Sequence, residues 1–225
     1  MAASDFDFVQ TRTQLIEGAL RKVGALGFGE SVSGEEAVNA AIALNEMIKE
    51  WQAKDVFLWQ LVPLTLTVTA NSSTVALPTD PPVLGIDDAQ YLVTGTTYED
   101  IEVISWREYQ AIETKSDAGQ IRKITMDNAR AGTAYVYPVP TTTTTVRILA
   151  IKKLKDWDTA TSTGDMPEHW ALAIKYGLAS LLADDYKLPL NERGALASKA
   201  VYYFNRAKGS DRDRSERLVV KGAYE

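Results

Sequence analysis

The stretch from Asp165 to Lys208 constrains the fold of this chain most strongly. Between Trp170 and Ala183 the only polar side chains are Lys175, Tyr176 and Ser180. A helix that is apolar on nearly every face is stable in water only when other elements cover it. The sequence therefore predicts a buried helix around which the rest of a helical bundle packs.

Both ends of this helix carry recognisable signals. Asp165 is expected to cap the helix because its carboxylate can accept hydrogen bonds from the first free backbone N–H groups, and Pro167 and Glu168 suit a first turn. Pro189 breaks the helical pattern, and apolar residues resume at helical spacing from about Asn191 to Ala207. These signals predict an antiparallel helical hairpin at the C-terminal end of the chain.

Two more helices are predicted near the N-terminus. Thr11 with Gln14, and Ser33 with Glu36, have the spacing of capping boxes, and each pair precedes apolar residues at helical spacing. Gly24 supplies a stop for the first of these helices. We expect an N-terminal hairpin that joins the C-terminal hairpin in one bundle.

The middle of the chain has the period of β-strands. Leu64, Leu66 and Val68 alternate with threonines, the sequence 71–73 supplies a turn, and alternation resumes at Val75 and Leu77, which predicts a β-hairpin. Further short β-prone runs follow as far as Ile151, and only Trp106 to Glu113 has a helical pattern. Several short strands of this kind predict a small β-sandwich or barrel.

The predicted fold class is α+β. The helical bundle is built from the N- and C-terminal helical hairpins, the β-domain is inserted between them, and an extended C-terminal tail follows. The expected boundaries are 1–57 for the N-terminal hairpin, 58–158 for the β-domain, 159–208 for the C-terminal hairpin and 209–225 for the tail. The tail alternates in charge and lacks apolar residues for a core of its own, so we expect order only against a partner.

Composition excludes several classes of function. The chain has no cysteine and one histidine, His169, so thiolate metal sites, disulfides and sites with several histidines are excluded, and no cofactor or metal is expected. The net charge of −6 means that any contact with nucleic acid must be local or weak. No apolar run approaches the roughly 20 residues of a membrane span, and no signal peptide is recognisable. We therefore expect synthesis in a cytoplasm and no membrane partner.

No set of residues predicts catalysis. The acidic pairs at 35–36, 87–88 and 184–185 could in principle supply the carboxylates of a glycosidase, but neighbouring side chains on a helix point in different directions. Cap and surface roles are therefore favoured for these acids. No nucleophile-elbow sequence accompanies His169, so a packing role is favoured there. We expect no catalytic residues.

The five tryptophans fall into two groups. Trp51 and Trp170 lie within apolar helical stripes and are predicted to belong to the core. Trp59, Trp106 and Trp157 lie near the ends of predicted elements, where tryptophan is common both in cores and in protein interfaces. These three are candidates for a protein interface.

Several segments resemble the head-to-tail adaptor proteins of short-tailed bacteriophages, also called tail accessory or head-completion factors. The similarity is spread in the same order along nearly the whole chain. It is carried by Thr13-Gln14-Leu15-Ile16, Arg21-Lys22-Val23-Gly24, the run from Leu44 to Ala53, the run from Trp106 to Ile112, Val136-Tyr137-Pro138-Val139-Pro140, the run from Met166 to Leu172, Leu178-Ala179 and Leu182-Ala183.

The resemblance implies a structural protein of the virion neck, assembled in the host cytoplasm. Such proteins bind the portal as a dodecameric ring, extend the DNA channel without sequence-specific binding and carry the next tail component, a nozzle or a tail fibre or spike. It also implies that the C-terminal tail grips the portal, and that deleting Asp211 to Glu225 weakens portal binding with little effect on thermal unfolding. The portal-binding candidates are Arg212, Arg214, Arg217, Leu218, Val219 and Val220.

Two other functions are compatible with the sequence. A virion-associated peptidoglycan hydrolase would need two carboxylates that meet in space. A carbohydrate-binding adsorption module would use Trp59, Trp106 or Trp157 as stacking surfaces for sugar rings.

Overall fold

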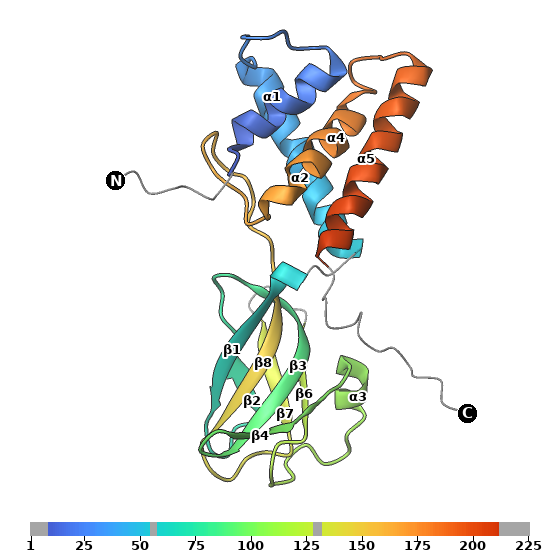
Figure 1. The fold of residues 1–225 in the computed structure, drawn as a ribbon. Coiled ribbons are helices and arrows are strands. Elements are labelled where there is room, and N and C mark those ends of the chain that lie inside the picture. Colours follow the sequence, from blue (N-terminus) through green and yellow to red (C-terminus); the bar gives the residue numbers. More distant parts are fainter. Residues whose placement is uncertain (1–8, 55–57, 128–131, 212–225) are drawn as a thin grey trace, which may run out of the picture. The chain divides into compact units, whose positions relative to one another are not determined.

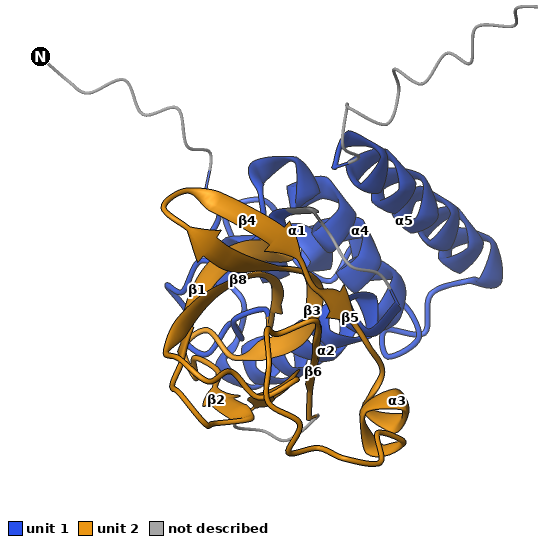
Figure 2. Ribbon diagram, turned by 90° about the horizontal axis from the view of Figure 1, so that it is seen from below, with its two compact units in different colours: residues 1–59, 154–225 blue, residues 60–153 orange. Residues whose placement is uncertain are grey.

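The computed structural model describes residues 9–54, 58–127 and 132–211. Within them the chain contains five α-helices and eight strands in two sheets, so the predicted α+β class is confirmed (Figure 1). The chain divides into two compact units (Figure 2). Residues 1–59 and 154–225 form one, the helical unit, and residues 60–153 form the other, the β unit.

The helical unit is organised around its fourth helix. Its helices are α1 (Arg12–Val23), α2 (Gly34–Lys54), α4 (Ala171–Leu182) and α5 (Leu190–Ser210), with the short 3₁₀ turn η2 (Glu168–Trp170) directly before α4. A further turn, η1 (Leu58–Gln60), lies at the boundary between the units. Helix α4 contacts α1, α2 and α5, as expected for a helix that is apolar on nearly every face.

The core of the helical unit explains why α4 is so apolar. Trp170 and Leu178 are completely buried, together with Leu44 of α2. Each such side chain contributes about 1.5–3 kcal/mol by leaving water. Gly177 lets α2 approach closely, because a Cβ atom at this position would lie 2.7 Å from the sulfur of Met47. The predicted burial of the 170–183 stretch is therefore confirmed in part, since Leu172 and Leu181 are each 46% exposed.

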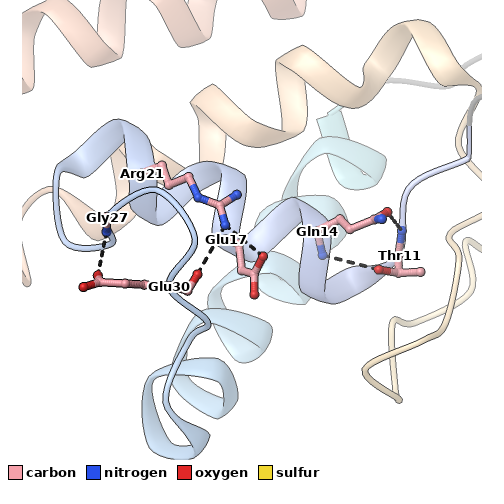
Figure 3. A network of polar contacts seen from close by, with 6 residues as sticks. All are labelled: Thr11, Gln14, Glu17, Arg21, Gly27 and Glu30. Carbon is pink, nitrogen blue, oxygen red and sulfur yellow. Dashed lines mark hydrogen bonds and ion pairs between the residues drawn. The ribbon is translucent and has the colours of Figure 1, made fainter.

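The start of α1 forms as its sequence predicts (Figure 3). The Gln14 backbone N–H donates to Thr11 Oγ1 at 3.3 Å, and the Thr11 N–H donates to Gln14 Oε1 at 3.0 Å, which completes the capping box. Further along α1, Arg21 pairs with Glu17, which lies one turn before it. Arg21 also donates a hydrogen bond to the backbone carbonyl of Glu30 at 3.3 Å. These contacts tie the loop after α1 back onto the helix.

The predicted start of α4 is wrong. The helical turns begin at Glu168 and Pro167 occupies the N-cap position, so Asp165 is not the N-cap residue. Pro167 is extended, with φ −58° and ψ 153°, so Asp165 lies two positions outside the first turn. Pro167 sets the start of the helical turns. Its own φ is compatible with both helical and extended backbone, but its ring keeps the residue before it out of the helical conformation.

The β unit contains two four-stranded sheets. The first has the order β1 (Leu61–Val68), β8 (Thr144–Lys152), β3 (Val83–Thr94) and β4 (Thr97–Asp100). The second has the order β2 (Thr74–Ala76), β7 (Thr133–Tyr137), β6 (Lys123–Met126) and β5 (Glu102–Val103). All neighbouring strands are antiparallel except β5 and β6.

Side chains from both sheets contribute to one hydrophobic cluster. Its buried members are Leu66, Val68, Leu77, Val83, Ala89, Ile101, Ile121, Ile124, Ala134, Val136, Val146, Ile148 and Ala150. The short helix α3 (Trp106–Gln110) follows β5 and begins with a capping box between Ser105 and Glu108. It is shorter than the helical pattern in the sequence, which ran to Glu113.

The predicted hairpin between the first two strands is wrong. β1 pairs with β8 along its whole length, from Leu61 opposite Ile151 to Val68 opposite Thr144, while β2 pairs with β7 in the other sheet. The turn after Val68 therefore connects two sheets. Alternation of apolar and polar residues determines which face of a strand is buried, but it carries no information about the partner strand.

Residues 154–158 lie in the helical unit, although the sequence placed them in the β-domain. Leu154 and Trp157 are buried in the helical core. Lys49 Nζ donates to the Leu154 carbonyl at 2.7 Å, and the Trp157 backbone N–H donates to Asn45 Oδ1 at 3.0 Å. Residues 153–158 form neither a strand nor a helix, so no periodic pattern in the sequence separates them from the preceding strand.

Candidate functional site

A carboxylate that is largely but not completely buried marks the point where α5 ends. Asp211 Oδ2 accepts hydrogen bonds from the indole N–H groups of Trp59 at 3.0 Å and Trp170 at 2.8 Å. Asp211 Oδ1 lies 2.8 Å from Nε2 of His169, and the Asp211 side chain is 10% exposed. We call these four residues the Asp211 cluster.

The four members of the Asp211 cluster come from three separate segments of the chain. Trp59 lies in η1, while His169 and Trp170 lie in η2, whose position is set by the burial of Trp170. Asp211 is the C-cap residue of α5. A carboxylate at a helix C-terminus is disfavoured by about 0.3–1 kcal/mol, and a buried carboxylate needs hydrogen-bond donors. The three donors therefore account for an acidic residue at this position.

The residue types of the Asp211 cluster suit a structural contact that holds the end of α5 in place. The His169–Asp211 pair has the distance of a catalytic dyad, but the other donors to the carboxylate are indole N–H groups, which do not act as acids or nucleophiles near neutral pH. The Trp170 ring also packs against Trp51 and Phe204, with ring centroids 5.8 and 5.5 Å apart. The predicted core role of Trp51 and Trp170 is confirmed, since both belong to this packed aromatic group.

The cluster corrects the expected boundary of the tail. α5 continues to Ser210, and Asp211 is bound to the helical unit, so a deletion that starts at Asp211 removes part of the folded unit. The sequence gives no periodic signal for this contact because 152 positions separate Trp59 from Asp211. The portal-binding candidates, from Arg212 to Val220, lie outside the described residues.

The three interface tryptophans have different environments. Trp157 is 2% exposed in the core of the helical unit, and Trp59 is bound to Asp211. Trp106, in contrast, is 39% exposed on α3. Its ring is stacked on Tyr109 with centroids 5.8 Å apart and meets the edge of Tyr135 at 4.9 Å. Trp106 thus presents a supported aromatic surface on the β unit.

One member of each acidic pair in the helical unit has a structural partner. Glu36 accepts from its own cap residue Ser33, and Tyr186 donates to Glu36 Oε1 at 3.1 Å. The Ser33 hydroxyl and then the Tyr186 hydroxyl hold the pKa of Glu36 below its usual value. Asp184 forms an ion pair with Arg193. These contacts are the cap and surface roles that the sequence favoured.

Lys175 is an unfavourable charge on α4. Its stem lies against α1, where a Cβ atom at Gly18 would be 2.8 Å from the Lys175 Cε atom. Burial lowers the pKa of Lys175, and repulsion from the cations of Lys22 and Arg21 lowers this pKa further. The folded state therefore tolerates the protonated form less well than the unfolded state does.

Replacing Lys175 with methionine is expected to raise the melting temperature at pH 7, by roughly 1–2 °C after allowance for solvent screening. In the wild-type chain, stability rises with pH between the lowered pKa and the ordinary value of 10.5, because the unfolded state binds more protons there. Thermal melts of both proteins from pH 7 to 10.5 should show the difference shrinking. A difference that is constant with pH would contradict this explanation.

When the chain is compared with known proteins, it matches one protein family. The family model described as SU10 adaptor protein matches residues 10–220. No curated protein matches the chain. The match confirms the resemblance to phage adaptor proteins that the sequence motifs indicated. Among the described residues, no helix is long and apolar enough to cross a membrane.

Proposed function

Because this chain belongs to the SU10 adaptor protein family, whose members are structural adaptors of bacteriophages, we propose that it joins the phage head to the tail. In this function it binds the portal protein as a ring, extends the DNA channel and carries the next tail component. The ring is a dodecamer by resemblance to short-tailed phage adaptors. Assembly takes place in the host cytoplasm, and the mature protein is part of the virion neck.

The extent of the family match carries this proposal. It spans residues of both compact units and continues to residue 220, which is nine positions beyond Asp211. The segment after α5 is therefore part of the family pattern. A C-terminal segment that belongs to the family pattern and lacks apolar residues for a core of its own is well suited to bind another protein.

The Asp211 cluster supports a division of labour within the chain. By fixing the end of α5, it holds the origin of the C-terminal segment in one place, which lowers the entropy lost when that segment binds. The segment itself is proposed to contact the portal through Arg212, Arg214, Arg217, Leu218, Val219 and Val220. Trp106 on the β unit is proposed to contact the next tail component, a nozzle or a tail fibre or spike.

The charge of the chain is compatible with a DNA channel. With a net charge of −6 per copy, a ring does not hold DNA by bulk attraction, so DNA can pass without sequence-specific binding. The roles of Glu36 and Asp184 in caps and ion pairs give no support to the peptidoglycan hydrolase or to other catalysis. Trp106 could also stack on a sugar, so sugar-dependent quenching of its fluorescence is the test of the adsorption module.

Assembly on the portal tests the proposed function directly. Purified protein mixed with purified portal rings is expected to form one stable complex, whose mass measured by light scattering exceeds that of the portal by a whole number of adaptor copies. Bovine serum albumin at the same concentration serves as the negative control. If no complex survives gel filtration at any mixing ratio, the proposed function is wrong.

A further inference from the structure

Two lysines lie over one tyrosine ring on the helical unit, and a third, Lys175, interacts electrostatically with one of them, Lys22. Tyr176 lies on α4, and the ring centroid is 4.2 Å from Nζ of Lys22 on α1 and 5.8 Å from Nζ of Lys199 on α5. Tyr203 of α5 is stacked on the same ring, with centroids 4.8 Å apart and planes inclined by 10°. Lys175 precedes Tyr176 on α4. We call Lys22, Lys175 and Lys199 with their central Tyr176 the basic face.

The basic face lacks compensating acids. In residues 9–54, 58–127 and 132–211, no carboxylate lies within ion-pair distance of the Nζ atoms of Lys22, Lys175 or Lys199. The nearby Arg21 is paired with Glu17 of its own helix. These three lysines therefore add positive charge to one part of a chain whose net charge is −6. An anion bound there would relieve their mutual repulsion.

The residue types favour phosphate over an acidic protein surface. Lysine is depleted in the cores of protein–protein interfaces, where arginine and aromatic residues dominate. Interfaces with DNA are much more positively charged, and lysine contacts phosphate as a mobile point charge on a flexible stem. Such contacts carry no sequence information, as a channel for DNA requires.

We propose that the basic face, made of Lys22, Lys175 and Lys199 with Tyr176, contacts the phosphate backbone of duplex DNA. The biological role of this contact rests on the proposed function, in which DNA passes through the ring. Three cations give a weak contact that depends strongly on salt. If each neutralises one phosphate, the logarithm of the binding constant falls with the logarithm of salt concentration with a slope of about −2.7.

The test compares two triple variants with the same change in charge. One carries K22Q, K175Q and K199Q, and the other carries K123Q, K153Q and K155Q, whose lysines belong to the β unit or directly follow it. Binding of a fluorescein-labelled 30-base-pair duplex is measured by anisotropy at several NaCl concentrations between about 50 and 200 mM. Circular dichroism melts establish that both variants are folded.

The basic-face variant is expected to bind at least tenfold more weakly at the lowest salt and to lose most of the salt dependence, while the control variant keeps both. An equal loss in both variants would assign the binding to total charge and overturn the proposal. An unchanged basic-face variant would overturn it as well. Binding of polyglutamate at least tenfold more tightly than a duplex of equal charge, measured by competition, would assign the face to an acidic protein surface instead.

A portal-binding arm separates this inference from the proposed function. The basic-face variant is expected to assemble on portal rings as well as the wild-type protein does, because its substitutions lie on α1, α4 and α5 and leave the C-terminal segment unchanged. Unaltered portal assembly with no effect on DNA binding would refute only the basic face. DNA binding that needs the three lysines, without any assembly on the portal, would refute only the proposed adaptor role.

Discussion

Replacing Asp211 with alanine is expected to lower the free energy of unfolding of the helical unit by about 2–4 kcal/mol. The substitution removes the acceptor shared by the indole N–H groups of Trp59 and Trp170 and the partner of His169. Hydrogen bonds to a charged group contribute about 1.5–3 kcal/mol each, and buried donors that lose their acceptor add a desolvation penalty. Loss of the unfavourable charge at the end of α5 offsets about 0.3–1 kcal/mol of this.

Urea unfolding followed by circular dichroism and tryptophan fluorescence measures this effect. Asp211→Asn keeps an oxygen acceptor at nearly the same position and should cost less than alanine. Asp158→Ala, at an exposed position in the same unit, is the matched control and should change the free energy by less than about 0.5 kcal/mol. If Asp211→Ala unfolds at the same urea concentration as the control, the cluster does not stabilise the protein.

A chain that ends after Asp211 is expected to lose binding to the portal while it keeps nearly the stability of the complete protein. The deleted residues, 212–225, contain all the proposed portal contacts, and the hydrogen bonds to Asp211 remain. The new terminal carboxylate at the end of α5 costs at most about 0.3–1 kcal/mol. A chain that ends after Ser210 should lose both portal binding and stability.

Gel filtration with portal rings and thermal melts distinguish these outcomes. A full-length variant with serine at Leu218, Val219 and Val220 removes the proposed apolar contacts without creating a new terminus, and is expected to bind at least tenfold more weakly. If the chain that ends after Asp211 binds the portal as well as the wild-type protein does, the C-terminal segment does not contact the portal as proposed. Equal melting temperatures for the two truncated chains would instead contradict the role of Asp211 as an anchor.

Local signals in the sequence predicted the helices well. The capping box of Thr11 and Gln14 involves residues three positions apart, so its geometry follows from the sequence. The apolar residues from Trp170 to Ala183 predicted a central helix for the same reason, because covering every face of a helix requires neighbours on every side. The start of α4 was missed, since Asp165 and Pro167 are both compatible with a first turn.

Long-range pairing was not predictable in the same way. The alternation in 64–68 correctly predicted a strand, but its partner is β8 near the other end of the β unit. Several strands have a similar alternation, so the local sequence does not select the partner of β1. The pairing that forms depends on the entropy of closing long loops and on how well the side chains fill a shared core. For the same reason, the sequence did not predict that Trp157 packs in the core of the helical unit.

The sequence by itself determined the α+β class, the central buried helix, the first capping box and the family resemblance, because each depends on residues that are close in the chain or on their order along it. Only the tertiary structure decided that Asp211 belongs to the folded unit and that Lys22 and Lys199 lie over the ring of Tyr176. Trp59 and Asp211 are 152 positions apart, and Tyr176 and these two lysines come from three helices. Such contacts form only when packing of the core brings distant segments together, so periodicity does not reveal them.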